Sequence, residues 1–324
     1  MPSLTDRRPP LPALVVGLAA IVAVMLLAFL TPAINSGASD LPLAVSAPPP
    51  ALEQISGALE QINPGAFEIT AVDGPESVTA AVEDRDAIGG LALGPDGVTV
   101  VTAGGAGAPY AAALRGIGGA LEAQGQQVTY TDVAPLTAKD PFGVGLASLA
   151  LPLIFGGLAS GALFSQFVRS SAAKLAGVLG VSVLAGYTAA LIVQTWFGAV
   201  EANYWLLGAV IALGIAAISA TVLGLEAILG RAGIALAAVL LLFISNPLSG
   251  LTAGPDWLPA PWGAIGQFLP LGSASTALRS TAYFDGRGMT TALIVLAAWT
   301  VIGLALVFLT SGRRAQREPA PSPA

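Results

Sequence analysis

The sequence predicts a polytopic α-helical membrane protein with six transmembrane helices and an extracytoplasmic α/β domain between the first and second helices. First, 55% of the 324 residues are apolar and 10% are charged, whereas about 25% of an average soluble domain is charged. Second, six uncharged runs of 19 to 23 residues are each long enough for a helix to cross a bilayer. Third, strand and helix patterns alternate in an acidic segment after the first run. The six runs are 11–30, 142–164, 175–197, 205–225, 232–250 and 291–310.

The chain begins with a short basic segment, residues 1–10, which contains Arg7 and Arg8. A basic start before the apolar run 11–30 fits either a cleaved signal peptide or a first transmembrane helix. The apolar part of a signal peptide usually has about 7–15 residues, whereas this run is longer and has no clear cleavage site at its end. We therefore favour an uncleaved first helix, and in both cases the residues that follow leave the cytoplasm.

Residues 31–140 are predicted to form the extracytoplasmic α/β domain. Alternating apolar residues predict strands, and apolar spacings of three and four predict helices. The resulting order, βαβαββαβ, favours one sheet covered by helices. The segment from Asp40 to Asp140 holds 13 acidic and three basic residues, so we expect no nucleic acid partner. The predicted strands are 41–46, 67–72, 87–93, 98–103 and 127–133, and the predicted helices are 49–62, 75–86 and 108–125.

Residues 141–311 are predicted to form a transmembrane domain of five helices. Its first two spans enclose a polar loop, residues 165–174, in which Arg169 and Lys174 favour a cytoplasmic position. With both termini in the cytoplasm, the inner segments hold eight basic residues and the much longer outer segments hold five. We therefore expect a multi-pass protein of the cell (inner or plasma) membrane, with a cytoplasmic tail at 312–324.

The segment before the last span, residues 251–289, is predicted to be re-entrant or to lie in the outer interface of the lipid bilayer. Its prolines interrupt a full span, yet it is too apolar for an ordinary loop. Trp257 and Trp262 are expected at the depth of the lipid headgroups, where tryptophan is enriched. Residues 269–284 are expected to form a short amphipathic helix that ends near Arg279.

The composition excludes several classes of chemistry. The chain contains no cysteine and no histidine, which excludes thiol chemistry, Cys/His metal sites and a Ser/His/Asp triad. A nucleotide-binding P-loop needs a lysine after a glycine-rich turn, and neither Lys139 nor Lys174 has that context. The uncharged spans also disfavour a proton relay. We therefore expect no enzymatic activity on this chain, no catalytic residue, no metal site and no cofactor.

Small residues recur in the spans at a spacing of four, which allows helices to pack closely. Packing within one bundle is the commoner use of such pairs, and a seam between two copies of the protein is the alternative. The pairs are Gly157/Gly161, Gly208/Ala212 and Ala216/Ala220.

One helix, an outer α/β domain and five further helices resemble the type-2 ABC exporter permeases (ABC-2 type), and most closely the branch of phage-infection-protein-like membrane proteins. The resemblance covers nearly the whole chain, and its motifs are VTAAVEDRDAIGGLALGPDG (78–97) and LPLGSASTALRSTAYFDG (269–286). It implies a separate ATP-binding subunit and a homodimer or heterodimer of permeases in the lipid bilayer. It also implies that the loop between the second and third helices contacts the ATPase.

In this chain that loop is 165–174, so the expected contact residues are Phe167, Arg169 and Lys174. Phe167 is expected to fill a pocket on the ATPase, and the two basic residues to pair with acidic groups around it. The alternative for Phe167 is a position in the lipid interface.

Two functions are consistent with these patterns. The first is the membrane permease subunit of an ABC exporter driven by a separate ATPase. The second is a non-transporting integral membrane protein whose outer domain binds a ligand, a cell-wall component or a partner protein. The association of an ATPase with the chain distinguishes the two.

Overall fold

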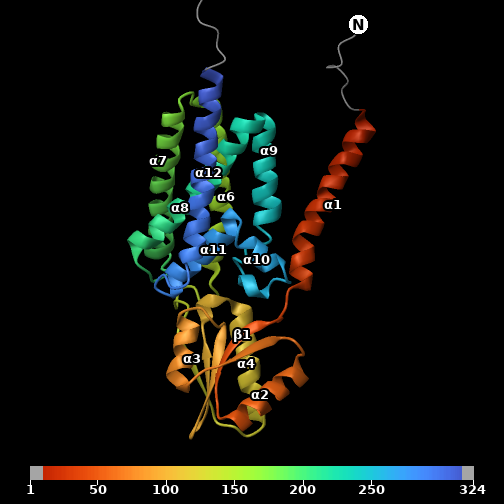
Figure 1. Ribbon diagram of the computed structural model, residues 1–324, viewed down its shortest axis with the longest axis vertical. Coiled ribbons are helices and arrows are strands. Elements are labelled where there is room, and N and C mark those ends of the chain that lie inside the picture. The colour runs from red at the N-terminus through yellow and green to blue at the C-terminus, as the bar shows by residue number, and fades with distance from the viewer. Residues whose placement is uncertain (1–9, 316–324) are drawn as a thin grey trace, which may run out of the picture.

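The computed structural model describes residues 10–315, with side chains described up to Ser311. A bundle of apolar helices and a smaller α/β domain follow one another along the long axis of the molecule (Figure 1). The start of the first helix, α1 (Leu11–Asn35), and the end of the last, α12 (Thr290–Ala315), both lie at the end of the bundle farthest from the α/β domain (Figure 1). The predicted N-terminal segment, apart from Pro10, and the tail after Ala315 lie outside the described residues.

The α/β domain is built on a five-stranded sheet with the order β2-β1-β3-β4-β5, in which only β3 and β4 pair antiparallel. The structure has every strand and helix that the sequence predicts for this segment. The strands are β1 (Leu41–Ser46), β2 (Phe67–Ala71), β3 (Gly89–Gly94), β4 (Gly97–Thr102) and β5 (Val128–Asp132). The helices are α2 (Pro49–Ile62), α3 (Gly74–Glu83) and α4 (Ala108–Ala123), with a 3-10 turn, η1 (Gly104–Ala106), before α4.

Both faces of the sheet are apolar. Leu43 and Val45 of β1 lie in a core with residues of α2 and α4, whereas Ala44 between them lies in a second core with residues of α3. Successive strand residues point to opposite faces, so α2 and α4 cover one side of the sheet and α3 covers the other.

Helix α3 ends earlier than the sequence predicts, at Glu83 and not at Asp86. Arg85 follows this end with φ 67°, a left-handed conformation that residues other than glycine rarely adopt. A residue in this conformation cannot continue a right-handed helix. The turn is important for the junction of the two parts, because Arg85 contacts the helical bundle.

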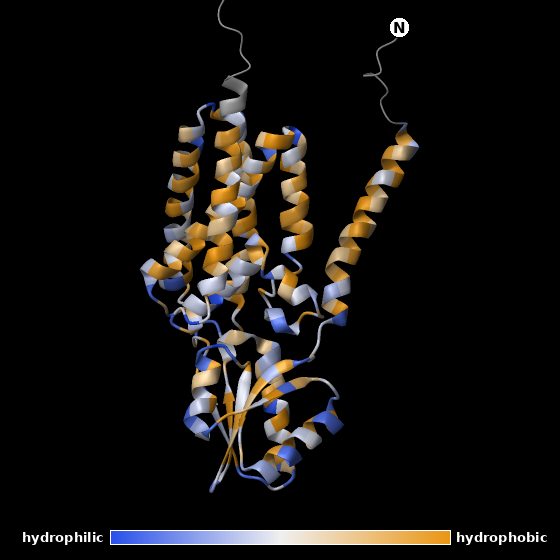
Figure 2. Cartoon of the chain, in the orientation of Figure 1, coloured by the Kyte–Doolittle hydropathy of each residue, from blue (hydrophilic) through white to orange (hydrophobic). Residues whose placement is uncertain are grey.

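Five helices within residues 10–315 are long and apolar enough to cross a membrane. Apolar residues dominate them, whereas the α/β domain is mixed (Figure 2). Helix α8 is the centre of the bundle, because 83% of its apolar window is buried, against 39% or less for each of the others. The five are α1, the pair α5 (Val144–Ala147) and α6 (Ala150–Phe167), α7 (Ser171–Ala190) with its π-helical end η2 (Leu191–Trp196), α8 (Tyr204–Leu229) and α12.

Small residues allow the close packing around α8. A Cβ atom at Gly157 of α6 would overlap the side chain of Ile218 in α8, and one at Gly161 would lie 2.7 Å from Cβ of Val222. Gly208 of α8 meets a side chain of α7 in the same way. These residues therefore pack helices within one bundle, as in the first of the two alternatives for such pairs.

The fifth predicted span, 232–250, is shorter in the structure. The apolar helix runs from Arg231 to Ser245, as α9 (Arg231–Val239) and a π-helical end, η3 (Leu240–Ser245). At about 1.5 Å per residue it reaches about 22 Å, less than the hydrocarbon core of about 30 Å. Pro247 has no backbone N–H, so it cannot continue the hydrogen-bond pattern of the helix. Five long helices and one shorter apolar helix thus stand where six spans are predicted.

The segment 251–289 contains a 3-10 turn, η4 (Pro255–Trp257), and two helices, α10 (Trp262–Gly266) and α11 (Pro270–Tyr283). The sequence predicts an amphipathic interfacial helix here, but 12 of the 14 residues of α11 are buried. Most of its side chains are small, which allows it to pack against α8 and α12. Two of its hydroxyl groups bond to backbone carbonyl oxygens, that of Ser273 to Gln267 at 2.6 Å and that of Thr281 to Ala277 at 2.9 Å. The predicted helix over 269–284 is therefore present, but the prediction that it is amphipathic is wrong.

Candidate functional site

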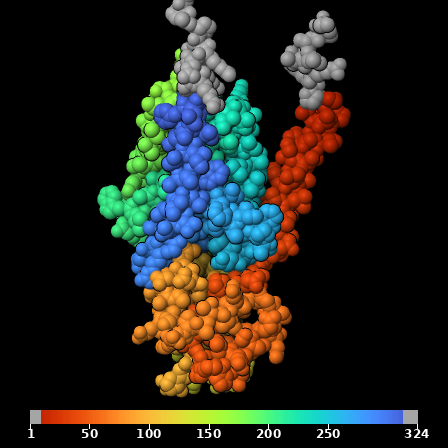
Figure 3. All heavy atoms as spheres, viewed as in Figure 1, coloured from red at the N-terminus to blue at the C-terminus, as the bar shows by residue number. Residues whose placement is uncertain are grey.

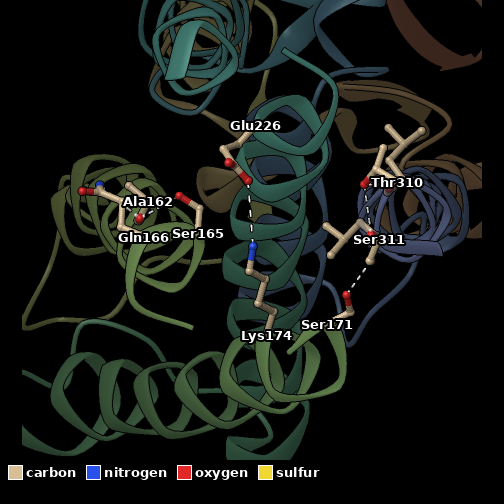
Figure 4. A network of polar contacts seen from close by, with 10 residues as sticks. Ala162, Ser165, Gln166, Ser171, Lys174, Glu226, Thr310 and Ser311 are labelled. Atoms are coloured by element: carbon tan, nitrogen blue, oxygen red, sulfur yellow. Dashed lines mark hydrogen bonds and ion pairs between the residues drawn. The ribbon is translucent and has the colours of Figure 1, made fainter. Parts of the chain in front are cut away.

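The first candidate site is the turn between α6 and α7. The sequence predicts a loop over 165–174, whereas only three residues, 168–170, lie between the two helices. Ser165 lies within α6, where its hydroxyl donates to the carbonyl oxygen of Ala162 at 2.9 Å (Figure 4). The polar residues that suggest a long loop thus belong to the ends of the two helices.

Two of the three predicted contact residues are exposed at this turn. Phe167, the last residue of α6, is 78% exposed, and Arg169 is also exposed. The hydroxyl of Ser170 accepts a hydrogen bond of 3.4 Å from the backbone N–H of Ala173, which caps the start of α7. The turn therefore presents an aromatic ring and a guanidinium group from a short, capped backbone.

Lys174, the third predicted contact residue, lies in the first turn of α7 and its side chain is only 14% exposed. Its Nζ atom lies 3.9 Å from Oε2 of Glu226, near the end of α8 (Figure 4). The early start of α7 directs this side chain toward α8 and away from the exposed surface of the turn. Lys174 therefore has an acidic partner within the chain.

The turn is connected to two neighbouring helices. Besides the ion pair with α8, the hydroxyl groups of Ser171 in α7 and Ser311 in α12 share a hydrogen bond of 2.6 Å (Figure 4). The start of α7 is therefore linked by polar contacts to both α8 and α12.

The second candidate site is the junction between the α/β domain and α11. Nη1 of Arg85 donates to the carbonyl oxygen of Thr276 at 3.2 Å and to the hydroxyl of Ser280. Its guanidinium carbon lies 5.2 Å from the ring centre of Phe284, a cation–π distance. Burial and the positive charge of Arg279 lower the pKa of Arg85 to about 10. At neutral pH Arg85 is still protonated, so a charged side chain joins the two parts.

A surface salt bridge lies at the same junction. Arg287, in the loop between α11 and α12, donates to Glu83 at 2.6 Å and lies 3.6 Å from Asp84. Exposed ion pairs contribute little to stability, about 0–1 kcal/mol. This one connects the end of α3 to the loop between α11 and α12, close in sequence to Arg85.

Arg279 lies deeper than the sequence predicts. Its expected position is the bilayer interface, but it is only 3% exposed. Its terminal nitrogens donate to the carbonyl oxygens of Gly250 at 3.2 Å and Leu251 at 2.7 Å. Arg279 therefore fastens α11 to the turn that follows the short helix α9–η3.

The two predicted interfacial tryptophans differ in position. Trp257 packs on the α/β domain, with its ring centre 5.9 Å from that of Tyr110 and its backbone N–H donating to the Tyr110 hydroxyl at 3.2 Å. Trp262 is 46% exposed, which fits a position among lipid headgroups. Of the two tryptophans that the sequence places at the bilayer interface, Trp257 therefore belongs to the junction and Trp262 to the surface.

No protein-family model, no curated protein and no solved structure matches this chain. Within the described residues, no group of three or more Asp or Glu side chains could hold a metal ion. The two sites are therefore contact surfaces. The first is an exposed turn with an aromatic residue near one end of α8, and the second is a packed junction in which α11 lies against α8.

Proposed function

We propose that this chain is the membrane permease subunit of an exporter that a separate ATP-binding subunit drives. The observation that carries the proposal is that α8 contacts elements of both candidate sites. It is paired with the start of α7 through Lys174 and Glu226, and it packs against α11 at the other site. A permease without a nucleotide-binding motif receives ATP-driven motion through a cytoplasmic contact, and the α6–α7 turn provides a suitable surface.

Phe167 is the anchor of this contact. A largely exposed phenyl ring is costly in water and stabilises a complex when it enters a pocket. Arg169, two residues later, pairs with acidic groups around that pocket. Lys174 has a different role from the one that the sequence suggests, because it braces α7 against α8.

Motion at the turn is transmitted to the outer domain through packed elements. Helix α11 lies against α8, with the side chain of Ala274 next to the backbone of Gly214. The hydrogen bonds of Arg85 then join α11 to the α/β domain. A tilt of α8 would move α11 and the α/β domain together, as rigid bodies move in transporters.

The active form is a homodimer or heterodimer of permeases in the cell (inner or plasma) membrane. The turn and both termini lie on the cytoplasmic side, and the α/β domain lies on the outer side. The positive-inside distribution supports this orientation.

A photo-reactive amino acid at Phe167, in cells of the native host, tests the proposal. The expected adduct contains an ATP-binding subunit, identified by mass spectrometry. Phe155 is the matched control, because it is 56% exposed on the membrane part of the same helix and should give no such adduct. Adducts with lipid alone at position 167 would contradict the contact and place Phe167 in the lipid interface.

The second candidate function is a non-transporting membrane protein whose outer domain binds a ligand. A large apolar cleft in the α/β domain favours it. An ATP-binding partner distinguishes the two candidate functions, since only the permease requires one.

A further inference from the structure

An apolar cleft lies in the α/β domain between α2, α4 and the sheet face that they cover. Its volume is about 740 Å³, within the range of about 300–1,000 Å³ that is typical of ligand sites. No charged side chain lines it, and its polar groups are neutral, such as the amides of Gln54 and Gln124. Its main apolar walls are Ile55, Ile62, Phe67, Leu91, Ile117 and Leu121.

The sequences of the two helices explain why the cleft is open. Helix α4 presents small residues to it, among them Ala113, Gly116 and Ala120. A Cβ atom at Gly116 would meet no other atom within 4 Å. On α2 only part of the apolar face is buried in the domain: Leu59 is 7% exposed, whereas Ile62 is 68% exposed. An apolar surface of this kind favours an apolar occupant.

A second cleft, of about 450 Å³, lies between the outer end of α1 and the bundle. Its walls include Phe29 and Pro32 of α1, Ala147 of α5 and most of the residues from 246 to 253. Pro32 is the one buried residue of α1, and the helix leans away from the bundle toward its far end (Figure 3). This flank of α1 is therefore open to the bilayer, from which a molecule can enter sideways.

Trp257 lines both clefts. Its position is fixed by Tyr110, which packs on the ring and accepts from the backbone N–H, and the Tyr110 hydroxyl in turn lies 3.5 Å from Oδ2 of Asp256. Trp257 thus stands between a cleft beside the membrane and a cleft in the outer domain.

We infer that the cleft of the α/β domain binds the acyl chain of a membrane lipid, which enters from the outer leaflet through the second cleft and passes Trp257. The uncharged lining suits a hydrocarbon chain, and the entrance beside α1 suits a molecule dissolved in the bilayer. A peptide or a nucleotide would leave charged or backbone polar groups without partners in such a lining. The binding of lipid rests on the two clefts, and its export as the substrate rests on the proposed function.

The test uses the full chain in nanodiscs that contain a phosphatidylethanolamine with a photoactivatable diazirine at the end of one acyl chain. Adducts are expected in α2 and α4, around 49–62 and 108–123, in addition to the spans. Gly116→Phe fills the cleft and should reduce the adducts in α2 and α4 at least tenfold. Gly119→Phe is the matched control, because it lies on the same helix, has equal space around its Cβ and does not line the cleft.

Adducts confined to the spans, or equal labelling of α2 and α4 in the two variants, would overturn the inference. Both changes replace a helical glycine and raise helix propensity, so both variants should fold. The smaller change Ala113→Leu, with Ala112→Leu as its control, repeats the comparison on the same helix. The measurement needs no ATP-binding subunit, so labelling of the cleft supports lipid binding whether or not such a partner is found. Failure to find that partner in the crosslinking experiment at position 167 would contradict only the proposed function.

Discussion

Lys174 at the start of α7 faces Glu226 at the end of α8, with Nζ and Oε2 3.9 Å apart. Both side chains are mostly buried, at 14% and 20% exposure, although they lie next to the exposed α6–α7 turn. This ion pair connects the beginning of one long apolar helix to the end of the central one. It therefore connects the surface of the turn with the core of the bundle.

A double-mutant cycle should measure this connection. Lys174→Ala and Glu226→Ala each leave a partly buried charge without its partner, whereas the double variant leaves none. We expect a coupling free energy of about 1 kcal/mol, between the values for exposed and buried pairs. Thermal unfolding of the four proteins in detergent gives this value. Strictly additive losses would show that the two charges do not interact.

Single cysteines should report the orientation of the chain, which has no cysteine of its own. Gln166→Cys, near the turn, should be shielded from an impermeant thiol reagent outside intact cells, and Ser56→Cys on α2 should react. Both positions are exposed, so access to the reagent depends on the side of the membrane. Labelling of position 166 in intact cells would reverse the proposed orientation, and lysed cells provide the control in which both sites react.

Arg85→Gly should loosen the junction between the two parts of the molecule. The change removes the bonds to Thr276 and Ser280, while glycine tolerates the left-handed backbone at this position. We expect unfolding to become easier by about 1–3 kcal/mol, with faster hydrogen exchange in α11. Arg115→Ala, on the exposed side of α4, is the control and should leave both unchanged. An unchanged melting temperature in Arg85→Gly would show that the contacts of Arg85 do not stabilise the junction.

The α/β domain is the part of the fold that sequence patterns predict best. Its strands are short apolar runs and its helices carry a proline in the first two positions, as with Pro49 and Pro75, so local signals agree with the final structure. The helical bundle is harder to predict from the sequence, because small polar residues occur both in exposed loops and in buried helices. Ser165 suggests a loop and Ser273 an exposed helix face, yet both hydroxyls bond to nearby carbonyl oxygens and remain in helices.

The candidate sites depend on distances between elements, which sequence patterns do not contain. Phe167 and Arg169 are found by their place in the turn, but the pairing of Lys174 with Glu226 requires the relative position of α7 and α8. The contacts of Arg85 join residues about 190 positions apart. The apolar stripe of α2 is visible in the sequence, whereas its separation from α4, which creates the cleft, is not.

The central claim is that Phe167 couples this chain to an ATP-binding subunit, and the affinity of the two purified proteins tests it most directly. Phe167→Ala should weaken association about thirtyfold, equivalent to about 2 kcal/mol, because the anchor of the contact is lost. Lys174→Ala should weaken it less, and Phe155→Ala, which removes an exposed phenyl ring from the membrane part of α6, should not weaken it. Unchanged affinity in Phe167→Ala, with all variants inserted normally, would contradict the account and favour the non-transporting protein.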